Sequence, residues 1–256
     1  MNRINEPCPQ QAFANAAAGL RAVILAGGRG ARLRPFTVNF PKPLMPLGDK
    51  PIIEILLHYL ARQGITDVTL TVGHLRELIK AYFLNAPALC PSCRISFVEE
   101  ESPTGTAGSL ASVAGLSETF LVMNGDVLTD LNLHELVEFH HARNAILTVA
   151  THVRRLKIDF GLLDFDDQYR IRRYHEKPEQ VHHVSMGIYV YEPAVLRYIE
   201  PGRYLDFPDL VLRLIEQGET VCAFPTECLW LDIGRPDDYA RAQELYSQGQ
   251  ETIERV

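Results

Sequence analysis

The feature that most constrains this chain is one segment near its start, AVILAGGRGARLRPFT, followed two residues later by FPKPLMPL. Residues 22–26 are a short apolar run, which predicts a buried parallel strand. The glycines that follow let the backbone turn sharply with its N–H groups facing outward, and such turns bind anions. Positive charge surrounds the turn, at Arg29, Arg32, Arg34 and Lys42. The segment therefore predicts an α/β chain that binds a polyphosphate where its first strand ends.

Two commoner phosphate-binding loops do not fit this segment. A P-loop needs Lys followed by Ser or Thr after its last glycine, and Gly30 is followed by Ala31 and Arg32. A dinucleotide fingerprint needs its glycines to open a helix, but Pro35 follows within a few residues. A glycine-rich turn with solvated arginines is the plain structural alternative. The ordered succession of strand, glycines, arginine and Pro-Lys-Pro favours a functional loop over it.

The segment resembles the signature of the sugar-phosphate nucleotidyltransferases, in which G-G-x-G-T/S-R-L-x-P-x-T precedes P-K-P. The departure is Ala31, where the family usually has Thr or Ser, so that only the backbone N–H can serve there. The resemblance implies that Arg32 and Lys42 are catalytic. It also implies a set of residues that bind the triphosphate: Leu25, Ala26, Gly27, Gly28, Gly30, Ala31, Arg32 and Lys42.

The length of 256 residues suits a single domain, and a hydrophobic content of 46% suffices for a sizeable core. Strand-like and helix-like runs alternate through the first 150 residues, which is typical of a Rossmann-like α/β fold with a doubly wound, mostly parallel sheet. The rhythm then changes to strands joined by turns, which indicates a mixed-sheet extension covering the sugar site. We expect a mobile tail over residues 1–20 and one domain over 21–256, divided into a nucleotide-binding half (21–150), a sugar-binding half (151–235) and a closing helix (236–256). The expected strands are 22–26, 68–72, 95–98, 121–123, 145–152, 170–175, 184–191 and, at an edge, 220–224; the expected helices are 50–62, 75–83, 106–114, 205–217 and 236–247.

Charge and cysteine content limit the partners and the compartment. The net charge of −7 argues against a general nucleic-acid binder, and no stretch reads as a signal peptide or a membrane span. Five cysteines, an odd number without a secretory signal, indicate a reducing cytoplasm. Cys90 and Cys93 form a single C-x-x-C, which could be half of a zinc site or a redox pair. Because no second pair completes a metal site, we favour a loop with incidental thiols.

Two carboxylates stand in segments that resemble the metal-ligand motifs of the family, G-D and W-x-D-I-G. Asp126 follows an apolar strand in LVMNGDVLTD, and Asp232 lies in WLDIGRPDDY. An Asp after a strand is commonly a turn former or a helix cap, but the paired resemblance favours Mg²⁺ binding by both. The neighbouring acids fit structural roles: Asp130 in a loop before a helix, and Asp237 in the first turn of another.

The segment RIRRYHEKPE carries the residues expected to read the sugar. Glu176 and Lys177 resemble the family's E-K-P, in which the Glu accepts sugar hydroxyls and the Lys meets the sugar phosphate. An exposed ion pair at a strand end is the alternative. The family commonly has Asn where this chain has Ser185. The resemblance implies a sugar-binding set of Gly161, Glu176, Lys177, Ser185 and Gly187, with Lys177 also catalytic.

The run EEESPTGTAGSL lies between the two halves and is expected to hold the base. Its small residues admit a flat ring, although a plain helix start is the alternative. The run resembles the P-L-G-T-A-G-P-L of mannose-1-phosphate guanylyltransferases, which favours GTP; uridylyl, thymidylyl and adenylyl transfer stay open. The further nucleotide-binding residues implied are Gly105, Thr106, Ala107, Gly108, Asn124 and Gly125.

The chemistry implied needs no protein nucleophile, acid or base. A sugar 1-phosphate is an anion at pH 7, and its oxygen can attack the α-phosphorus of a triphosphate in line as pyrophosphate leaves. Positioning and neutralisation of crowded negative charge supply the catalysis. A nucleotide-sensing regulatory subunit that has lost turnover is the rival from another class, and a homo-oligomer is left open.

Overall fold

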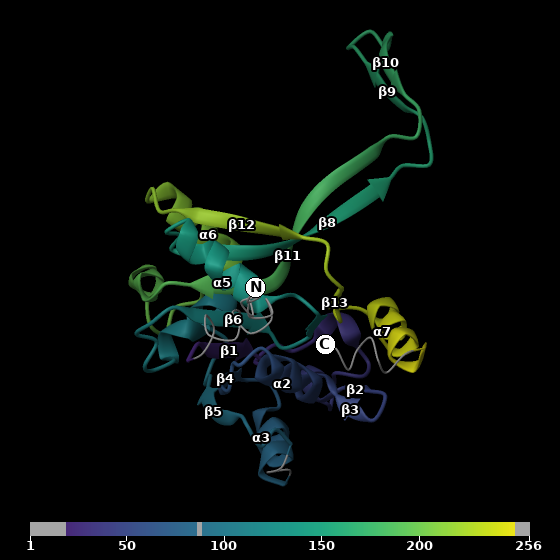
Figure 1. Cartoon of the computed structure of the whole chain (residues 1–256). Coiled ribbons are helices and arrows are strands. Elements are labelled where there is room, and N and C mark those ends of the chain that lie inside the picture. The colour runs from purple at the N-terminus through teal and green to yellow at the C-terminus, as the bar shows by residue number, and fades with distance from the viewer. Residues whose placement is uncertain (1–18, 86–88, 249–256) are drawn as a thin grey trace, which may run out of the picture.

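The computed structural model describes residues 19–85 and 89–248, and its centre is a seven-stranded sheet in the order β12-β8-β11-β6-β1-β4-β5 (Figure 1). The parallel pairs are β1 with β4, β1 with β6, β4 with β5, and β8 with β12, whereas β11 runs antiparallel to both β6 and β8. The strands are β1 Arg21–Leu25, β4 Asp67–Val72, β5 Arg94–Glu99, β6 Phe120–Asn124, β8 Leu147–Lys157, β11 Glu179–Tyr191 and β12 Val221–Thr226. The chain proceeds outward from β1 to β4 and β5 and then returns to β6 on the other side of β1. Ligands bind at such a switch point in open α/β sheets.

Both faces of the sheet are covered. In β1, Ala22 and Ile24 join the core cluster that α2 (Ile52–Arg62) and α5 (Leu133–Ala142) help to form, whereas Val23 joins the opposite cluster with α6 (Phe207–Glu216). Alternate residues of a strand point to opposite faces, so β1 is buried from both sides, as the apolar run indicates. The other helices are α3 Arg76–Asn85, the one-turn α4 Gly105–Gly108 and α7 Pro236–Gln248. In the part of the chain that the structure describes, no helix is long and apolar enough to cross a bilayer.

Most expected elements are present within a few residues, and β12 is an edge strand as predicted. The helix expected over 106–114 is an exception, because only α4 is α-helical and a 3₁₀ turn, Ser109–Ser112, follows it. Gly108 lies there with room for no side chain, since an added Cβ would fall 2.7 Å from the carbonyl oxygen of Arg203. Two three-residue strands were not predicted, β7 Val127–Thr129 and β13 Trp230–Asp232, which pair antiparallel. Their length is too short to give a periodic pattern.

The second half of the chain departs most from expectation. Beyond the body of the sheet, β8 and β11 stay paired from Thr151 and Ser185 out to Lys157 and Glu179. They carry a terminal hairpin of β9 (Leu162–Phe165) and β10 (Ile171–His175), so that residues 152–184 form an arm that projects from the molecule (Figure 1). The mixed-sheet extension is present as expected, and in this structure its outer part stands away from the cavity of the same chain. The physical reason is the continuous ladder, which holds both strands straight where they leave the body.

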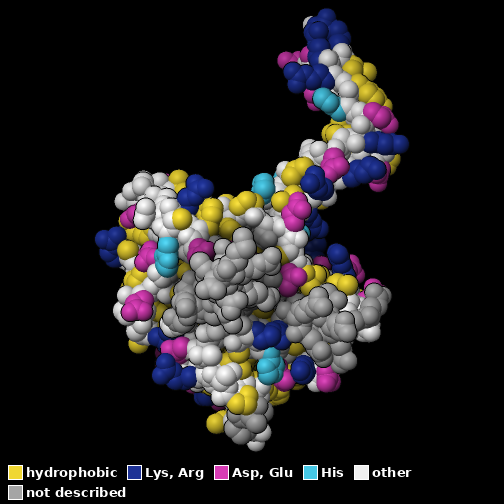
Figure 2. Space-filling view, viewed as in Figure 1, with side chains coloured by type: hydrophobic (Ala, Val, Ile, Leu, Met, Phe, Trp, Pro, Cys, Tyr) yellow, Lys and Arg dark blue, Asp and Glu magenta, His cyan; other side chains and the backbone are white. Residues whose placement is uncertain are grey.

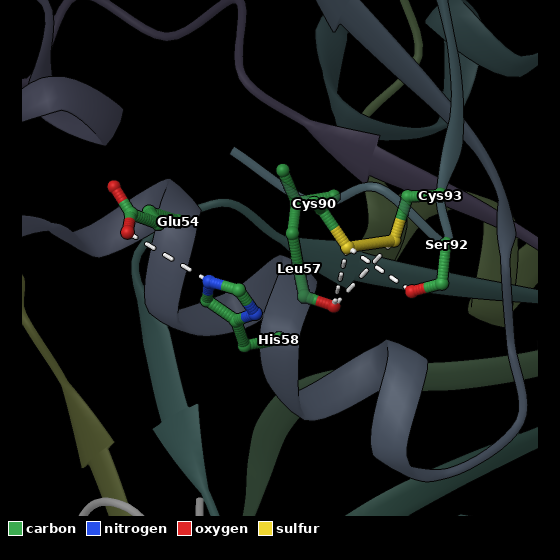
Figure 3. The surroundings of a disulfide bond; sticks show 6 residues. All are labelled: Glu54, Leu57, His58, Cys90, Ser92 and Cys93. Carbon is green, nitrogen blue, oxygen red and sulfur yellow. Dashed lines mark hydrogen bonds and ion pairs between the residues drawn. A yellow bond between two sulfur atoms is a disulfide. The ribbon is translucent and has the colours of Figure 1, made fainter. Parts of the chain in front are cut away.

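The interpretation of Cys90 and Cys93 as incidental thiols is wrong, because a disulfide joins them (Figure 3). The three-residue separation places their Cα atoms 5.3 Å apart, within the usual range for a disulfide. The bond lies before β5, at the edge of the sheet opposite the carboxyl ends of the parallel strands. Of the expected tail, residues 1–18 lie outside the described part of the chain, as does the end of the closing helix beyond residue 248.

Candidate active site

A cavity of about 440 Å³ opens at the carboxyl ends of β1, β4 and β6, at the switch point of the sheet. The residues expected to bind nucleotide and metal that line it are Leu25, Ala26, Gly27, Gly28, Gly30, Ala31, Arg32, Lys42, Gly105, Thr106, Asn124, Gly125 and Asp126. Ala107 and Gly108 are buried in α4, beside the wall that Gly105 and Thr106 form. Residues as far apart in the sequence as Leu25 and Asp126 thus meet at one cavity.

The glycine-rich loop adopts a conformation that only small residues allow. Gly30 has a φ of 57°, and its carbonyl oxygen accepts a hydrogen bond of 2.7 Å from the Thr37 hydroxyl. A Cβ on Gly27 would fall 2.4 Å from an Oε of Glu100. After Gly30 the backbone forms a 3₁₀ turn, Ala31–Leu33, which buries Leu33 and leaves Ala31 and Arg32 at the cavity. The loop is therefore a short backbone cradle that ends in an arginine.

Opposite charges meet at one end of this cavity. Lys42 sits in a 3₁₀ turn between two prolines, and its ammonium forms an ion pair with the Asp126 carboxylate. Both side chains are largely enclosed, with exposed fractions of 11% for Lys42 and 16% for Asp126. An enclosed ion pair loses less of its strength to solvent than a surface pair does. Lys42 of the loop and Asp126 at the strand end thus form an enclosed ion pair at the cavity.

The β7–β13 pair places the second carboxylate beside the first. Asp232 is opposite Val127 in the register, and the Ile233 N–H donates to the Asp126 carbonyl oxygen at 3.0 Å. Burial raises the pKa of Asp232, and the negative charge of Asp126 raises that pKa further, against the opposing effects of Lys42 and Arg32. Two carboxylates whose charges interact in a partly buried site are a suitable oxygen donor set for Mg²⁺. The described residues offer no cluster of three or more His, Cys, Asp or Glu that could hold a metal ion.

Arg32 faces the same carboxylate. A Cβ built on Gly234 would lie 3.2 Å from a carboxylate oxygen of Asp232 and 3.4 Å from the guanidinium carbon of Arg32. Both side chains therefore approach the backbone of Gly234, a residue that also lines the cavity. The segment W-L-D-I-G thus brings Asp232 and Gly234 close to Arg32 of the glycine-rich loop. Two cations and two carboxylates thus converge at one end of the site.

The other end of the cavity contains acidic residues that the sequence analysis did not identify. Glu100 follows β5, lines the cavity, and accepts hydrogen bonds from the backbone N–H and the hydroxyl of Thr104. Asp206 accepts from the Thr106 N–H at 3.2 Å and from the Tyr204 hydroxyl at 2.7 Å. The position of Glu100 directly after a strand was a signal that could have been used. Asp206 gave none, because its place depends on how α6 packs against α4.

The predicted sugar-binding residues are divided between two places. Ser185 and Gly187 lie at the root of the arm, where a Cβ on Gly187 would fall 2.5 Å from the amide nitrogen of Asn124, a residue that lines the cavity. Gly161, Glu176 and Lys177 lie on the arm itself, and the structure does not bring them to the cavity of the same chain. Glu176 and Lys177 are 58% and 57% exposed, with their charged groups 4.0 Å apart.

Comparison with known proteins agrees with this geometry. The model of the family described as Nucleotidyl transferase matches residues 21–249. The chain belongs to this family. It is 33% identical over 241 residues to a UTP–glucose-1-phosphate uridylyltransferase of Synechocystis, covering 87% of this chain and 62% of that protein. It is 34% identical over 226 residues to a mannose-1-phosphate guanylyltransferase of Mycobacterium tuberculosis, covering 86% and 62%.

A solved structure shows the same fold. The crystal structure of HddC from Yersinia pseudotuberculosis complexed with GMP-PN superimposes with a TM-score of 0.68 at 24% identity, over 89% of this chain and 99% of that one. This likeness confirms the α/β architecture with a mostly parallel sheet. The chain spans about 62% of the length of both curated relatives.

Proposed function

We propose that this chain transfers a nucleotidyl group from GTP to a sugar 1-phosphate, giving a nucleotide sugar and pyrophosphate. The observation that carries the proposal is the convergence of Arg32, Lys42, Asp126 and Asp232 at one end of a glycine-lined cavity. A triphosphate and a sugar phosphate together bring many negative charges into one site. A site with two cations and two metal-ligating carboxylates is suited to neutralise that charge.

The reaction follows from charge and position. A phosphate oxygen of the sugar 1-phosphate attacks the α-phosphorus, the bond from that phosphorus to the bridging oxygen breaks, and pyrophosphate leaves with the electron pair. Arg32 and Lys42 neutralise the triphosphate, and the backbone N–H groups near Gly28 cradle it. Mg²⁺, on which this family typically depends, would be held by Asp126 and Asp232 and would neutralise phosphate charge. Because the nucleophile is already ionised, no protein base is needed.

The preference for guanine rests on Glu100 as well as on the G-T-A-G run. An ionised carboxylate only accepts hydrogen bonds. Guanine presents two adjacent donors, its N1–H and its exocyclic amino group, whereas uracil and thymine present one N–H and the corresponding edge of adenine presents a donor beside an acceptor. A carboxylate in the wall of the cavity therefore suits guanine best. The guanylyltransferase relative, and GMP-PN in a protein of the same fold, accord with this choice.

The test is an assay of pyrophosphate release with Mg²⁺, each of GTP, UTP, dTTP and ATP, and a panel of sugar 1-phosphates. We expect GTP to give a kcat/KM on the order of 100-fold above the others, because a wrong base leaves polar groups of the site unpaired. Highest activity with UTP or dTTP would overturn guanylyl transfer and retain nucleotidyl transfer. Binding of a triphosphate without turnover on any sugar would favour the regulatory rival.

A further inference from the structure

We propose that the arm of one chain closes over the cavity of a second copy and supplies Glu176 and Lys177 to the sugar phosphate bound there; this rests on the proposed function. The partner is thus a second copy of this chain, in a reciprocal two-fold dimer. In such a dimer each copy gives an arm and receives one.

The arm exposes many large apolar side chains, as surfaces that bind another protein do. Large apolar side chains stand in solvent along it, with exposed fractions between 51% and 83%, at Phe160, Phe165, Tyr169, Ile171, Tyr174 and Val181. Figure 2 shows yellow, hydrophobic side chains along the part of the chain that projects from the body. A two-stranded ribbon is marginally stable by itself in water, and grouped apolar side chains mark sites of association. The arm therefore gains stability when another surface covers it.

A rigid swing of the arm cannot bring Lys177 to the cavity of its own chain. The root of the arm at Gly187 touches Asn124, which lines the cavity, and Asp126 lies only two residues from Asn124, at most about 7 Å away along the chain. Lys177 lies beyond Glu179, and the eight residues from Gly187 to Glu179 span about 27 Å of extended strand. Rotation about the root keeps that distance constant. Lys177 therefore stays far from a reaction centre that adjoins the root, unless the β8–β11 ladder opens.

The ladder has no break within the arm where it could bend back. Its register is continuous from Ser185 and Thr151 to Glu179 and Lys157, and its one irregularity lies at the root, between Ser185 and Tyr189. Bringing Lys177 back to its own cavity would separate this whole paired stretch. Reaching a second copy preserves every one of these hydrogen bonds. The continuous ladder thus favours delivery to another chain.

The charge of the arm favours a second copy of this chain as its partner over nucleic acid or an acidic membrane. Residues 152–184 contain seven Lys or Arg and six Asp or Glu, whereas the whole chain has 25 and 32. A near-neutral arm does not suit nucleic acid or an acidic membrane. With seven cationic and six anionic side chains, the arm is slightly positive and suits the acidic remainder of another copy, which holds the other 18 Lys or Arg and 26 Asp or Glu. Lys177 itself has a φ of 45°, a strained conformation for a lysine, in the turn that presents it outward.

The first test is the mass of the full chain by sedimentation velocity. We expect a dimer, and we expect the double variant Phe165→Ser, Ile171→Ser to be a monomer with unchanged circular dichroism. The matched control is Leu212→Ser, which removes an equally exposed apolar side chain from α6 and should leave the dimer intact. A monomeric wild-type chain, or a dimer that the double variant leaves intact, overturns the proposal whatever the activity.

The second test separates delivery between copies from action within one chain. Asp126→Asn and Lys177→Ala each inactivate their own homodimer; mixed dimers have one site with Asp126 intact and Lys177 delivered from the other copy. Random mixing should then restore about a quarter of wild-type pyrophosphate release. Replacing the Asp126→Asn chain by the double variant Asp126→Asn, Lys177→Ala should abolish the recovery.

The outcomes distinguish this proposal from the function on which it rests. Active wild-type protein without recovery in the mixture means that Lys177 acts within its own chain or not at all, which overturns the delivery and leaves the function standing. A dimer that the arm variant dissociates, but that releases no pyrophosphate with any substrate pair, overturns the function and the role of Lys177. In that case only the arm-mediated dimer is upheld.

Discussion

The cavity and the arm differ in how their functional residues are held. Around the cavity, sheet register and close packing hold the residues in place. Asp126 lies beside the β7–β13 pair and forms an ion pair with Lys42, and Gly27 lies so close to Glu100 that it has no room for a side chain. On the arm, Glu176 and Lys177 are more than half exposed, with their charged groups 4.0 Å apart, and Glu176 accepts a hydrogen bond of 2.7 Å from the Tyr174 hydroxyl. The cavity is built within one chain, whereas the arm residues do not line the cavity of their own chain. Under the proposal that the arm supplies Glu176 and Lys177 to the sugar phosphate, preorganised charge and substrate selection lie on separate parts of one fold.

Asp126→Asn should have the largest effect if the cavity is the reaction centre. The amide keeps the shape of the strand end but loses the charge that Lys42 and Mg²⁺ meet, so pyrophosphate release should fall at least about 1000-fold. Steady-state assays together with circular dichroism check this. Asp237→Asn, at the first turn of α7, is the control and should stay near wild type. Turnover of the Asp126 variant within about threefold of wild type would show that the cavity carboxylate is not needed.

Lys177→Ala should have the next largest effect, and it tests whether the arm selects the sugar. The loss of one charge-assisted contact in a closed site costs roughly 2–4 kcal/mol, or about 30- to 1000-fold in kcat/KM for the sugar 1-phosphate. The Kd for GTP, measured by calorimetry, should change little. Lys157→Ala, on the same arm, is the control. Equal losses in GTP affinity and sugar use would erase the distinction between the two regions.

Glu100→Gln should have a smaller, base-specific effect. The amide offers one acceptor and one donor where guanine needs two acceptors, so kcat/KM with GTP should fall about 10- to 100-fold and with UTP much less. Glu101→Gln replaces the exposed neighbouring carboxylate and should leave the ratio of GTP to UTP activity unchanged. A Glu100 variant that loses both activities in parallel would place this carboxylate in a structural role with Thr104.

Asp232→Asn should lower pyrophosphate release much as Asp126→Asn does, and its separate effect on stability is the smallest effect expected. Because the pKa of Asp232 is raised by burial and by Asp126, the folded protein holds this proton to higher pH than the unfolded chain does. Stability is therefore lost as the pH rises from about 4 through the folded-state pKa, and at pH 7 the ionised carboxylate destabilises the fold. The metal-free variant should melt above wild type at pH 7, by about 2–4 °C for each kcal/mol relieved, and the gain should vanish at pH 3. Asp237→Asn should not raise Tm, and an equal gain at pH 3 and 7 would rule out the electrostatic cause.

The sequence predicted best those parts of the site whose shape depends on residues close together in the chain. The glycine-rich loop, Arg32 and Lys42 were predicted because their shape depends on neighbouring residues: glycine at φ 57° and prolines on either side of the lysine. Glu100 and Asp206 were missed because only the packing of β5 and α6 brings them to the cavity. The place of Lys177 was also beyond local reasoning. The outer part of the β8–β11 ladder, which carries it outward, pairs residues 153–157 with 179–183, and no strand was predicted over these two segments.

The central claim is that a sugar phosphate oxygen attacks the α-phosphorus of GTP, and isotope labelling tests it most directly. The full chain is incubated with Mg²⁺, GTP and the preferred sugar 1-phosphate carrying ¹⁸O between the anomeric carbon and phosphorus, and the products are weighed by mass spectrometry. Because neither bond to that oxygen breaks, the account predicts that all of the label appears in the nucleotide sugar and none in pyrophosphate. Label in pyrophosphate or in water, or the release of pyrophosphate without a nucleotide sugar, would contradict it.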